Sequence, residues 1–292
     1  MNPLPLLLIA VSTVTHAYWN FLLKRAKGTQ TFIALSKLVE VVVFAPVALA
    51  LFIQAPPPLA QFWWLIVGAA VITTAYYVAL GTAYNKGNLS LVYPVARAGS
   101  LAFLPILAFV FIQEQIDWVG GVAISIIILG IFIIQLEGLD RAAVGRLLAG
   151  ASQPALLWAL AAAFLAAAYS LWDKYALRYL PVFLYYYVYT VVSAAAYIFV
   201  LAAGSSQHKL GDEFRAHNKE IAQVALISMF TYMLVLFALQ NGKTSYVIAL
   251  RQLSVGASAL MGRFWLGEHF GGHRWVGLGV LLAGCIMVSL AR

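Results

Sequence analysis

The chain has 292 residues, of which 63% are hydrophobic and only 10% are charged, and its mean hydropathy is +0.90. A soluble domain carries roughly 25% charged residues, so this composition excludes a water-exposed globular surface and predicts a single membrane domain. The formal net charge is +8, but the 18 Lys and Arg lie mostly at the ends of apolar blocks. That pattern is typical of membrane orientation and not of nucleic-acid binding.

Apolar blocks of about twenty residues follow one another, each long enough to cross a bilayer core of roughly 30 Å as a helix. Charged, Gly and Pro residues separate the blocks and predict ten transmembrane helices in an all-α polytopic protein. The predicted spans are 4–23, 31–53, 62–84, 89–112, 118–136, 154–173, 181–203, 221–240, 244–266 and 274–291. No basic residue precedes the first span and no small-residue cleavage signal follows it, so we expect a retained helix there.

The two halves of the chain repeat one pattern at an offset of 154 to 157 residues. The matched positions are Tyr77 and Tyr232, Arg97 and Arg251, Glu114 and Glu268, and Trp118-Val119-Gly120 and Trp275-Val276-Gly277. Five helices per half is an odd number, so the halves must cross the membrane in opposite senses and form two inverted five-helix repeats. We therefore expect a first repeat at 1–136, a linker at 137–153 and a second repeat at 154–292.

The repeated segment carries a family resemblance. Ala83-Tyr84-Asn85-Lys86-Gly87-Asn88-Leu89-Ser90 leads into Pro94 and Pro105, and Glu114 and Trp118-Val119-Gly120 close the segment. The second copy ends in Gly267-Glu268 and Trp275-Val276-Gly277-Leu278-Gly279. These motifs resemble the EamA module of the drug/metabolite transporter superfamily, over nearly the whole chain. The resemblance implies metabolite transport, since characterised relatives export amino acids and other metabolites or carry nucleotide sugars and triose phosphates.

Two features depart from the resemblance. Aromatic amino-acid exporters of this group are similar in having a Tyr and a Trp in the fourth helix, where this chain has Ala98 and Ser100. Relatives are also usually drawn with both termini cytoplasmic. In this chain Lys and Arg are more frequent in the loops opposite the termini, which favours both termini outside. The side of the membrane on which the termini lie is therefore left open. We expect a multi-pass protein of the bacterial inner (plasma) membrane.

Charged residues inside membrane spans are costly and usually face the interior of the helix bundle. Arg97 in the fourth span and Arg251 in the ninth occupy equivalent positions of the two halves. They are predicted to flank a central cavity and to bind a carboxylate or phosphate through bidentate hydrogen bonds, with Gln252 as a further polar group. The alternative is that one or both arginines extend to the interface or hold neighbouring helices together.

Polar and aromatic faces of other spans supply further candidates for substrate contact. On the first helix His16 begins a face with spacing i, i+3, i+4, and aromatic stripes run along the third and sixth helices. The predicted substrate-binding residues are His16, Trp19, Asn20, Tyr77, Tyr84, Tyr93, Arg97, Trp158, Tyr169, Trp172, Arg251 and Gln252. Packing or interfacial belts are the alternative for the aromatic residues, and a hydrogen-bonded packing role is the alternative for His16.

Several other residues are predicted to be structural. Lys37 and Glu40 are three apart on one helix face and can neutralise each other, although Glu40 as a proton-coupling carboxylate is an alternative. Glu114 and its counterpart in the second half are predicted to cap or pair helices. The run 185–187 of three tyrosines is predicted to be mostly interfacial, because three consecutive positions cannot share a helix face. Cys285 is predicted to be a small residue facing lipid or a helix.

The sequence has no Walker-type phosphate loop, no His/Glu metal pattern and no nucleophile elbow, so we expect no cofactor, no metal site and no catalysis. We predict a secondary transporter or facilitator, active as a monomer in the lipid bilayer without nucleic acid. It would move a small amphipathic metabolite, with an amino acid the favoured class, by alternating access. An exporter of drug-like or lipid-linked amphiphiles is one alternative, and an integral-membrane enzyme or scaffold subunit is another.

Overall fold

The computed structural model describes residues 3–26, 30–87, 89–136, 145, 153–203, 210–265, 267 and 270–291. The regular elements in these ranges are all α-helices, so the predicted all-α class is confirmed. The first half contains α1 (Pro3–Arg25), α2 (Gln30–Gln54), α3 (Leu59–Lys86), α4 (Leu89–Ile112) and α5 (Trp118–Gln135). The second half contains α7 (Gln153–Ala176), α8 (Val182–Ala203), α9 (Leu210–Asn241), α10 (Thr244–Arg251), α11 (Leu253–Trp265) and α12 (Gly272–Leu290). Most of the predicted linker 137–153 lies outside the described residues.

The helices follow the predicted spans closely, with two differences. The helix α9 begins within the predicted polar stretch, where Asp212 and Glu213 in its first turn interact favourably with the helix dipole. The ninth predicted span is divided at Gln252 into α10 and α11. The N–H of Gln252 donates to the carbonyl of Ala249, three residues back, at 3.1 Å. The helix is therefore tightened locally at the position of a predicted binding residue.

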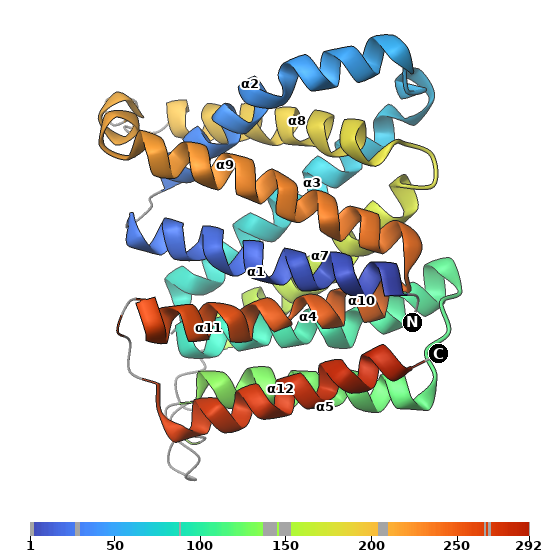
Figure 1. Cartoon of the computed structure of the whole chain (residues 1–292), viewed down its shortest axis with the longest axis vertical. Coiled ribbons are helices and arrows are strands. Elements are labelled where there is room, and N and C mark those ends of the chain that lie inside the picture. Colours follow the sequence, from blue (N-terminus) through green and yellow to red (C-terminus); the bar gives the residue numbers. More distant parts are fainter. Residues whose placement is uncertain are drawn as a thin grey trace.

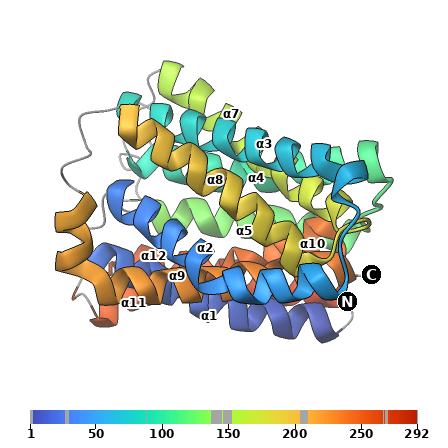
Figure 2. The same cartoon turned by 90° about the horizontal axis from the view of Figure 1, so that it is seen from above.

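Eight helices of the described chain are long and apolar enough to cross a membrane, namely α1 to α5, α7, α9 and α12. The apolar stretch Val182–Ala196 of α8 is shorter, and α10 and α11 have only 8 and 13 residues. Since a crossing takes about twenty residues, neither α10 nor α11 is long enough to cross alone, and the total of ten crossings stays a prediction. Both termini lie at one end of the bundle, which is consistent with an even number of crossings (Figure 1, Figure 2). The helix α9 begins at the other end.

Small residues allow the closest contacts between helices. Along the α5 and α12 pair, a Cβ on Gly130 would lie 2.7 Å from the backbone nitrogen of Leu281 (Figure 1). In the same pair, a Cβ on Gly277 would lie 2.7 Å from the backbone nitrogen of Ile134. The helix α7 packs against α3 and α4 and is lined with buried alanines, including Ala155, Ala159, Ala162, Ala163 and Ala167. Lipid is as apolar as these side chains, so close van der Waals packing of this kind stabilises the bundle.

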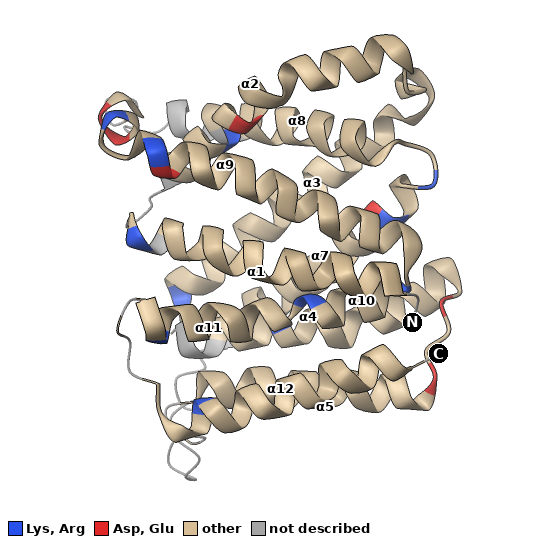
Figure 3. Ribbon diagram, viewed as in Figure 1, with Lys and Arg blue, Asp and Glu red and all other residues tan. Residues whose placement is uncertain are grey.

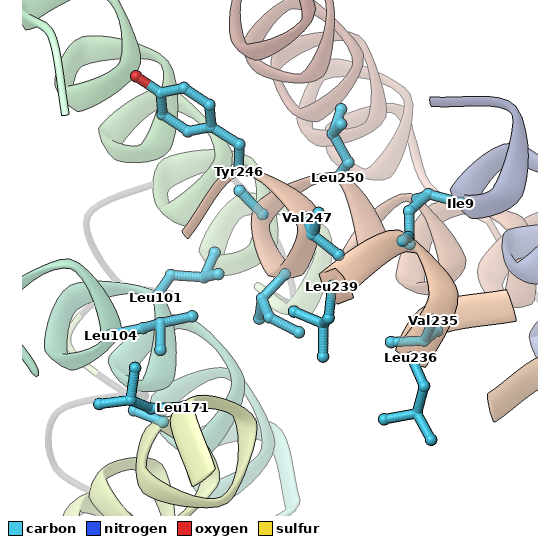
Figure 4. Packing of buried hydrophobic residues seen from close by; sticks show 14 of the residues in the cluster. Ile9, Leu101, Leu104, Leu171, Val235, Leu236, Leu239, Tyr246, Val247 and Leu250 are labelled. Carbon is cyan, nitrogen blue, oxygen red and sulfur yellow. The ribbon is translucent and has the colours of Figure 1, made fainter. Parts of the chain in front are cut away.

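The short helix α10 lies inside the largest apolar cluster. Figure 4 shows Val247 and Leu250 of α10 among side chains from α9 and α1, including Leu239 and Ile9, with leucines of α4 and α7 on the other side. All of these side chains are nearly fully buried. Helices from both halves therefore fix the position of α10.

The tyrosine run in α8 was predicted to be mostly interfacial, and this prediction is wrong. Tyr185 and Tyr186 are only 1% and 3% exposed. The hydroxyl of Tyr185 donates to Asp173 at 2.6 Å, and the hydroxyl of Tyr186 accepts from Lys37 at 3.2 Å. Because α2, α3 and α9 all pack against α8, successive positions of this helix face different neighbours and are buried together.

Candidate functional site

A small polar cavity lies where helices of the two halves meet. It has a volume of about 20 Å³, enough for roughly one water molecule. The residues that line it are Tyr76 of α3, Ala96, Arg97 and Ser100 of α4, Ala166, Tyr169 and Ser170 of α7, Ile248 and Arg251 of α10, and Gln252. Four of the predicted binding residues, Arg97, Tyr169, Arg251 and Gln252, therefore share one cavity.

The two arginines have matching surroundings. Ser100 donates to the carbonyl of Arg97 at 2.7 Å, and Ser254 donates to the carbonyl of Arg251 at 2.8 Å. The guanidinium carbon of Arg97 lies 5.6 Å from the ring centre of Tyr93, a predicted binding residue, within the range of a cation–π interaction. The ion pairs of the described chain do not include either arginine. Figure 3 shows that most other charged residues lie toward the ends of the bundle.

The first half of the chain holds the start of α10, the helix that ends in Arg251. The carboxylate of Glu114 accepts hydrogen bonds from the N–H of Thr244 at 2.7 Å and the N–H of Ser245 at 2.9 Å. These N–H groups have no partner within the helix, and a negative charge is favourable at this end. Tyr246 adds a hydrogen bond of 2.6 Å to Asp117. The capping role predicted for Glu114 is confirmed, and its counterpart in the second half lies outside the described residues.

A buried carboxylate lies one turn along α7 from the cavity. Asp173 is 5% exposed and accepts from the hydroxyl of Tyr185 at 2.6 Å and from the hydroxyl of Tyr232 at 2.7 Å. The guanidinium carbon of Arg251 lies over the ring of Tyr232, 5.4 Å from the ring centre. One tyrosine therefore connects the carboxylate to a cavity arginine.

The predicted pairing of Lys37 with Glu40 is confirmed. Lys37 Nζ lies 2.8 Å from Glu40 Oε2, which also accepts from Ser228 of α9 at 3.1 Å. Glu40 is 1% exposed, and Lys37 donates further to Tyr186 of α8. The pair therefore joins α2 to α8 and α9, away from the residues that line the cavity.

The remaining predicted residues lie in different places. His16 is 8% exposed and lies within electrostatic range of both cavity arginines. The ring of Trp19 lies 5.1 Å from the ring of His16, and the side chain of Asn20 donates to the His16 carbonyl at 2.7 Å. Trp172 donates to a backbone carbonyl of α3 at 2.7 Å and holds α3 to α7. Tyr84 packs in a small cluster with α7. Tyr77 and Trp158 are 49% and 39% exposed, and neither side chain lines the cavity.

Four polar residues at or near the cavity were not predicted. Tyr76 is adjacent to the predicted Tyr77, and the structure turns the former inward. Ser100 could have been found from the repeat, because it follows Arg97 by three residues just as Ser254 follows Arg251 in the second half. Ser170 and Asp173 lie within a predicted span, where an acidic residue is itself an indication of function.

Helices that can span a membrane, packed around a cavity with two arginines, define an integral multi-pass membrane protein with an internal polar site. Residues 153–290 match the profile of the EamA-like transporter family. That family is part of the drug/metabolite transporter superfamily, and the match covers the second half of the chain. The match points to a membrane transporter of small solutes rather than to an enzyme.

The fold has been seen before. Twenty-nine chains from solved structures match this chain, and one of them, from a structure described as a crystal structure of a protein, is 14% identical. Its TM-score is 0.74, and the match covers 97% of this chain and 96% of that one. At this identity the likeness concerns the fold alone. A search of curated proteins gave no match.

Proposed function

We propose that the chain is a secondary transporter or facilitator that moves a small amphipathic carboxylate, with an amino acid as the favoured class, by alternating access. The observation that carries this proposal is that Arg97 and Arg251, one from each half, line one cavity without an ion-pair partner among the described residues. Two guanidinium groups can hold one carboxylate through several charge-assisted hydrogen bonds. The aromatic walls formed by Tyr76 and Tyr169 suit an apolar side chain. We expect the bacterial inner membrane as its location.

Inverted repeats are part of the proposal and have support in the helix contacts. The helix α3 packs against α7 as α9 packs against α1, and α4 packs against α7 as α11 packs against α1. The helices α2 and α8 pack against each other, as do α5 and α12. Reciprocal contacts of this kind are expected of two halves related by a twofold axis in the membrane plane.

The size of the cavity supports alternating access. About 20 Å³ holds one water molecule and no amino acid, so a substrate needs the helices around the cavity to separate. The break between α10 and α11 is a suitable place for movement, because binding sites of transporters often lie at discontinuous helices. We place the moving elements at α4 and α10, which carry the two arginines.

Export of an amphiphile is the second candidate, and one observation favours it. A groove of about 220 Å³ lies between α1, the α10 and α11 junction, and α12. The residues that line it are mostly apolar, namely Leu6, Ile9, Ala10, Leu250, Leu253, Leu282, Cys285, Ile286 and Ser289. Leu250 and Leu253 flank the cavity residues Arg251 and Gln252, so an acyl tail in the groove would lie near the polar cavity.

The test of the proposal uses Arg97→Gln and Arg251→Gln in proteoliposomes loaded with a mixture of radiolabelled L-amino acids. Hydrogen bonds to charged groups contribute roughly 1.5–3 kcal/mol, so each change should lower transport about tenfold or more while the unfolding temperature changes little. Arg25→Gln is the control, because the Arg25 side chain is 52% exposed and pairs with Glu220 at a helix end. Normal transport by both cavity variants, at equal protein content, would remove the arginines from the site. Movement of a fluorescent lysolipid without movement of amino acids would favour the second candidate.

A further inference from the structure

The buried carboxylate of Asp173 has unusual partners. Its two oxygens accept from the hydroxyls of Tyr185 and Tyr232, and it forms no ion pair with a Lys or Arg of the described chain. A buried charge without a cation is costly in a membrane, where acidic residues usually face a cavity or a proton path. Glu40, the other acidic residue buried in a described span, has Lys37 at 2.8 Å. Of these two buried carboxylates, Asp173 is therefore the one without an ion pair among the described residues, and its protonation state depends on the polar groups around it.

The surroundings of Asp173 lead to the cavity. Tyr232 donates to Asp173 through its hydroxyl, and the guanidinium of Arg251 lies over the ring of the same tyrosine. Arg251 lies within electrostatic range of Asp173 and is itself part of the cavity lining. The other titratable groups that act on this carboxylate are Tyr185 and Tyr189 of α8. The single cation that acts on Asp173 within the described chain is thus a residue proposed to bind substrate.

We propose that Asp173 binds a proton that crosses the membrane together with the substrate carboxylate, so that transport is proton symport. This inference rests on the proposed function. In the empty cavity the charge of Arg251 favours the ionised form of Asp173. When the substrate carboxylate neutralises Arg251, Asp173 is left as a buried anion without a cation.

The carboxylate of Asp173 then takes up one proton and becomes a neutral carboxylic acid, with no other bond formed or broken. Substrate and proton therefore bind cooperatively, and by linkage each promotes the binding of the other. When the substrate leaves Arg251 on the opposite side, the same linkage releases the proton there. Asp173 is not among the residues that line the cavity, so the proton does not compete with the substrate for one position.

The first experiment follows the proton directly. Infrared difference spectra of the purified protein at a series of pH values should contain the stretching band of the protonated Asp173 carboxyl group beside those of the other carboxyl groups, and Asp173→Asn should lack the Asp173 band. Tyr232→Phe keeps the ring beneath Arg251 and removes one hydroxyl that donates to the ionised form. It should move the midpoint of the band to higher pH by about 1–2 units. A band that persists unchanged in Asp173→Asn would overturn the proposal.

The second experiment follows transport in proteoliposomes with the radiolabelled L-amino acid mixture. The wild-type protein should accumulate label on the alkaline side of an imposed pH gradient, and a proton ionophore should abolish the accumulation. Its affinity for the mixture should rise about 5- to 150-fold as the pH falls through the midpoint of the band. Asp173→Asn should reach equilibration only, with affinity that does not depend on pH. Glu220→Gln is the matched control, because this carboxylate is 26% exposed and pairs with Arg25 at the end of α1, and it should accumulate label as the wild type does.

The outcomes separate the two proposals. Wild-type transport that ignores the pH gradient, or accumulation on the acidic side, would overturn proton symport and leave the proposed function intact. Accumulation by Asp173→Asn at the wild-type level would also overturn it. A wild-type protein that moves no amino acid would instead overturn the proposed function, while the infrared band would still decide whether Asp173 takes up a proton.

Discussion

The contact between α5 and α10 predicts a large difference between two adjacent glycines. A Cβ on Gly120 would lie 2.2 Å from the hydroxyl oxygen of Tyr246, far inside van der Waals contact, whereas a Cβ on Gly121 would have no other atom within 4 Å. The tyrosine cannot move away easily, because its side chain is fully buried and its hydroxyl donates to Asp117 at 2.6 Å. Gly120→Ala should therefore destabilise the protein, and Gly121→Ala should not.

The magnitude follows from the groups that must move. Loss of the hydrogen bond between Tyr246 and the Asp117 carboxylate costs roughly 1.5–3 kcal/mol, and overpacking costs roughly 1–3 kcal/mol. The helix preference for Ala over Gly offsets at most about 1 kcal/mol of this. The net loss for Gly120→Ala is therefore about 2–5 kcal/mol, whereas Gly121→Ala should stay within about 0.5 kcal/mol of the wild type or become slightly more stable.

The lone cysteine provides the assay. Cys285 is 4% exposed, so a thiol-reactive fluorescent dye should react with it only when the bundle opens on heating. At about 2–4 °C per kcal/mol, Gly120→Ala should unfold roughly 4–20 °C below the wild type. If the two alanine variants unfold at the same temperature, the close approach of α5 to Tyr246 does not exist as described. The contact matters for transport because it fixes the start of the helix that ends in Arg251.

Two further predictions concern charged residues that connect helices. Glu114→Gln leaves one carbonyl oxygen for the N–H groups of Thr244 and Ser245, so it should lower the free energy of unfolding by about 1.5–3 kcal/mol. The control is Asp212→Asn in the exposed first turn of α9, which should cost about 0.3–1 kcal/mol. Equal losses in the dye assay would contradict the capping role of Glu114. Lys37→Met leaves Glu40 buried without its cation and should cost about 3 kcal/mol, near the lower limit for a buried pair because Lys37 is 29% exposed. The double change Lys37→Met with Glu40→Gln should recover most of that loss, and additive losses in this double-mutant cycle would show that the pair does not interact.

Much of the architecture could be predicted from the sequence because lipid imposes simple rules. Each helix must satisfy its own backbone groups and present about twenty apolar residues, so composition and punctuation locate most helix ends within a few residues, the start of α9 excepted. The repeat offset placed Arg97 and Arg251 at equivalent positions, and the structure brings both to one cavity. The i, i+3 spacing predicted the ion pair between Lys37 and Glu40, because residues three apart share one face of a helix.

Contacts between helices were decided by the tertiary structure alone. Whether a residue of a helix faces lipid, a neighbour or a cavity depends on which helices surround it, and sequence spacing does not contain that information. This is why Tyr76 lines the cavity while Tyr77 is 49% exposed, and why Tyr185 and Tyr186 are both buried. The partners of Asp173 come from α8 and α9, which lie beside α7 only after the bundle has formed, so the link from this carboxylate to Arg251 exists only in the fold.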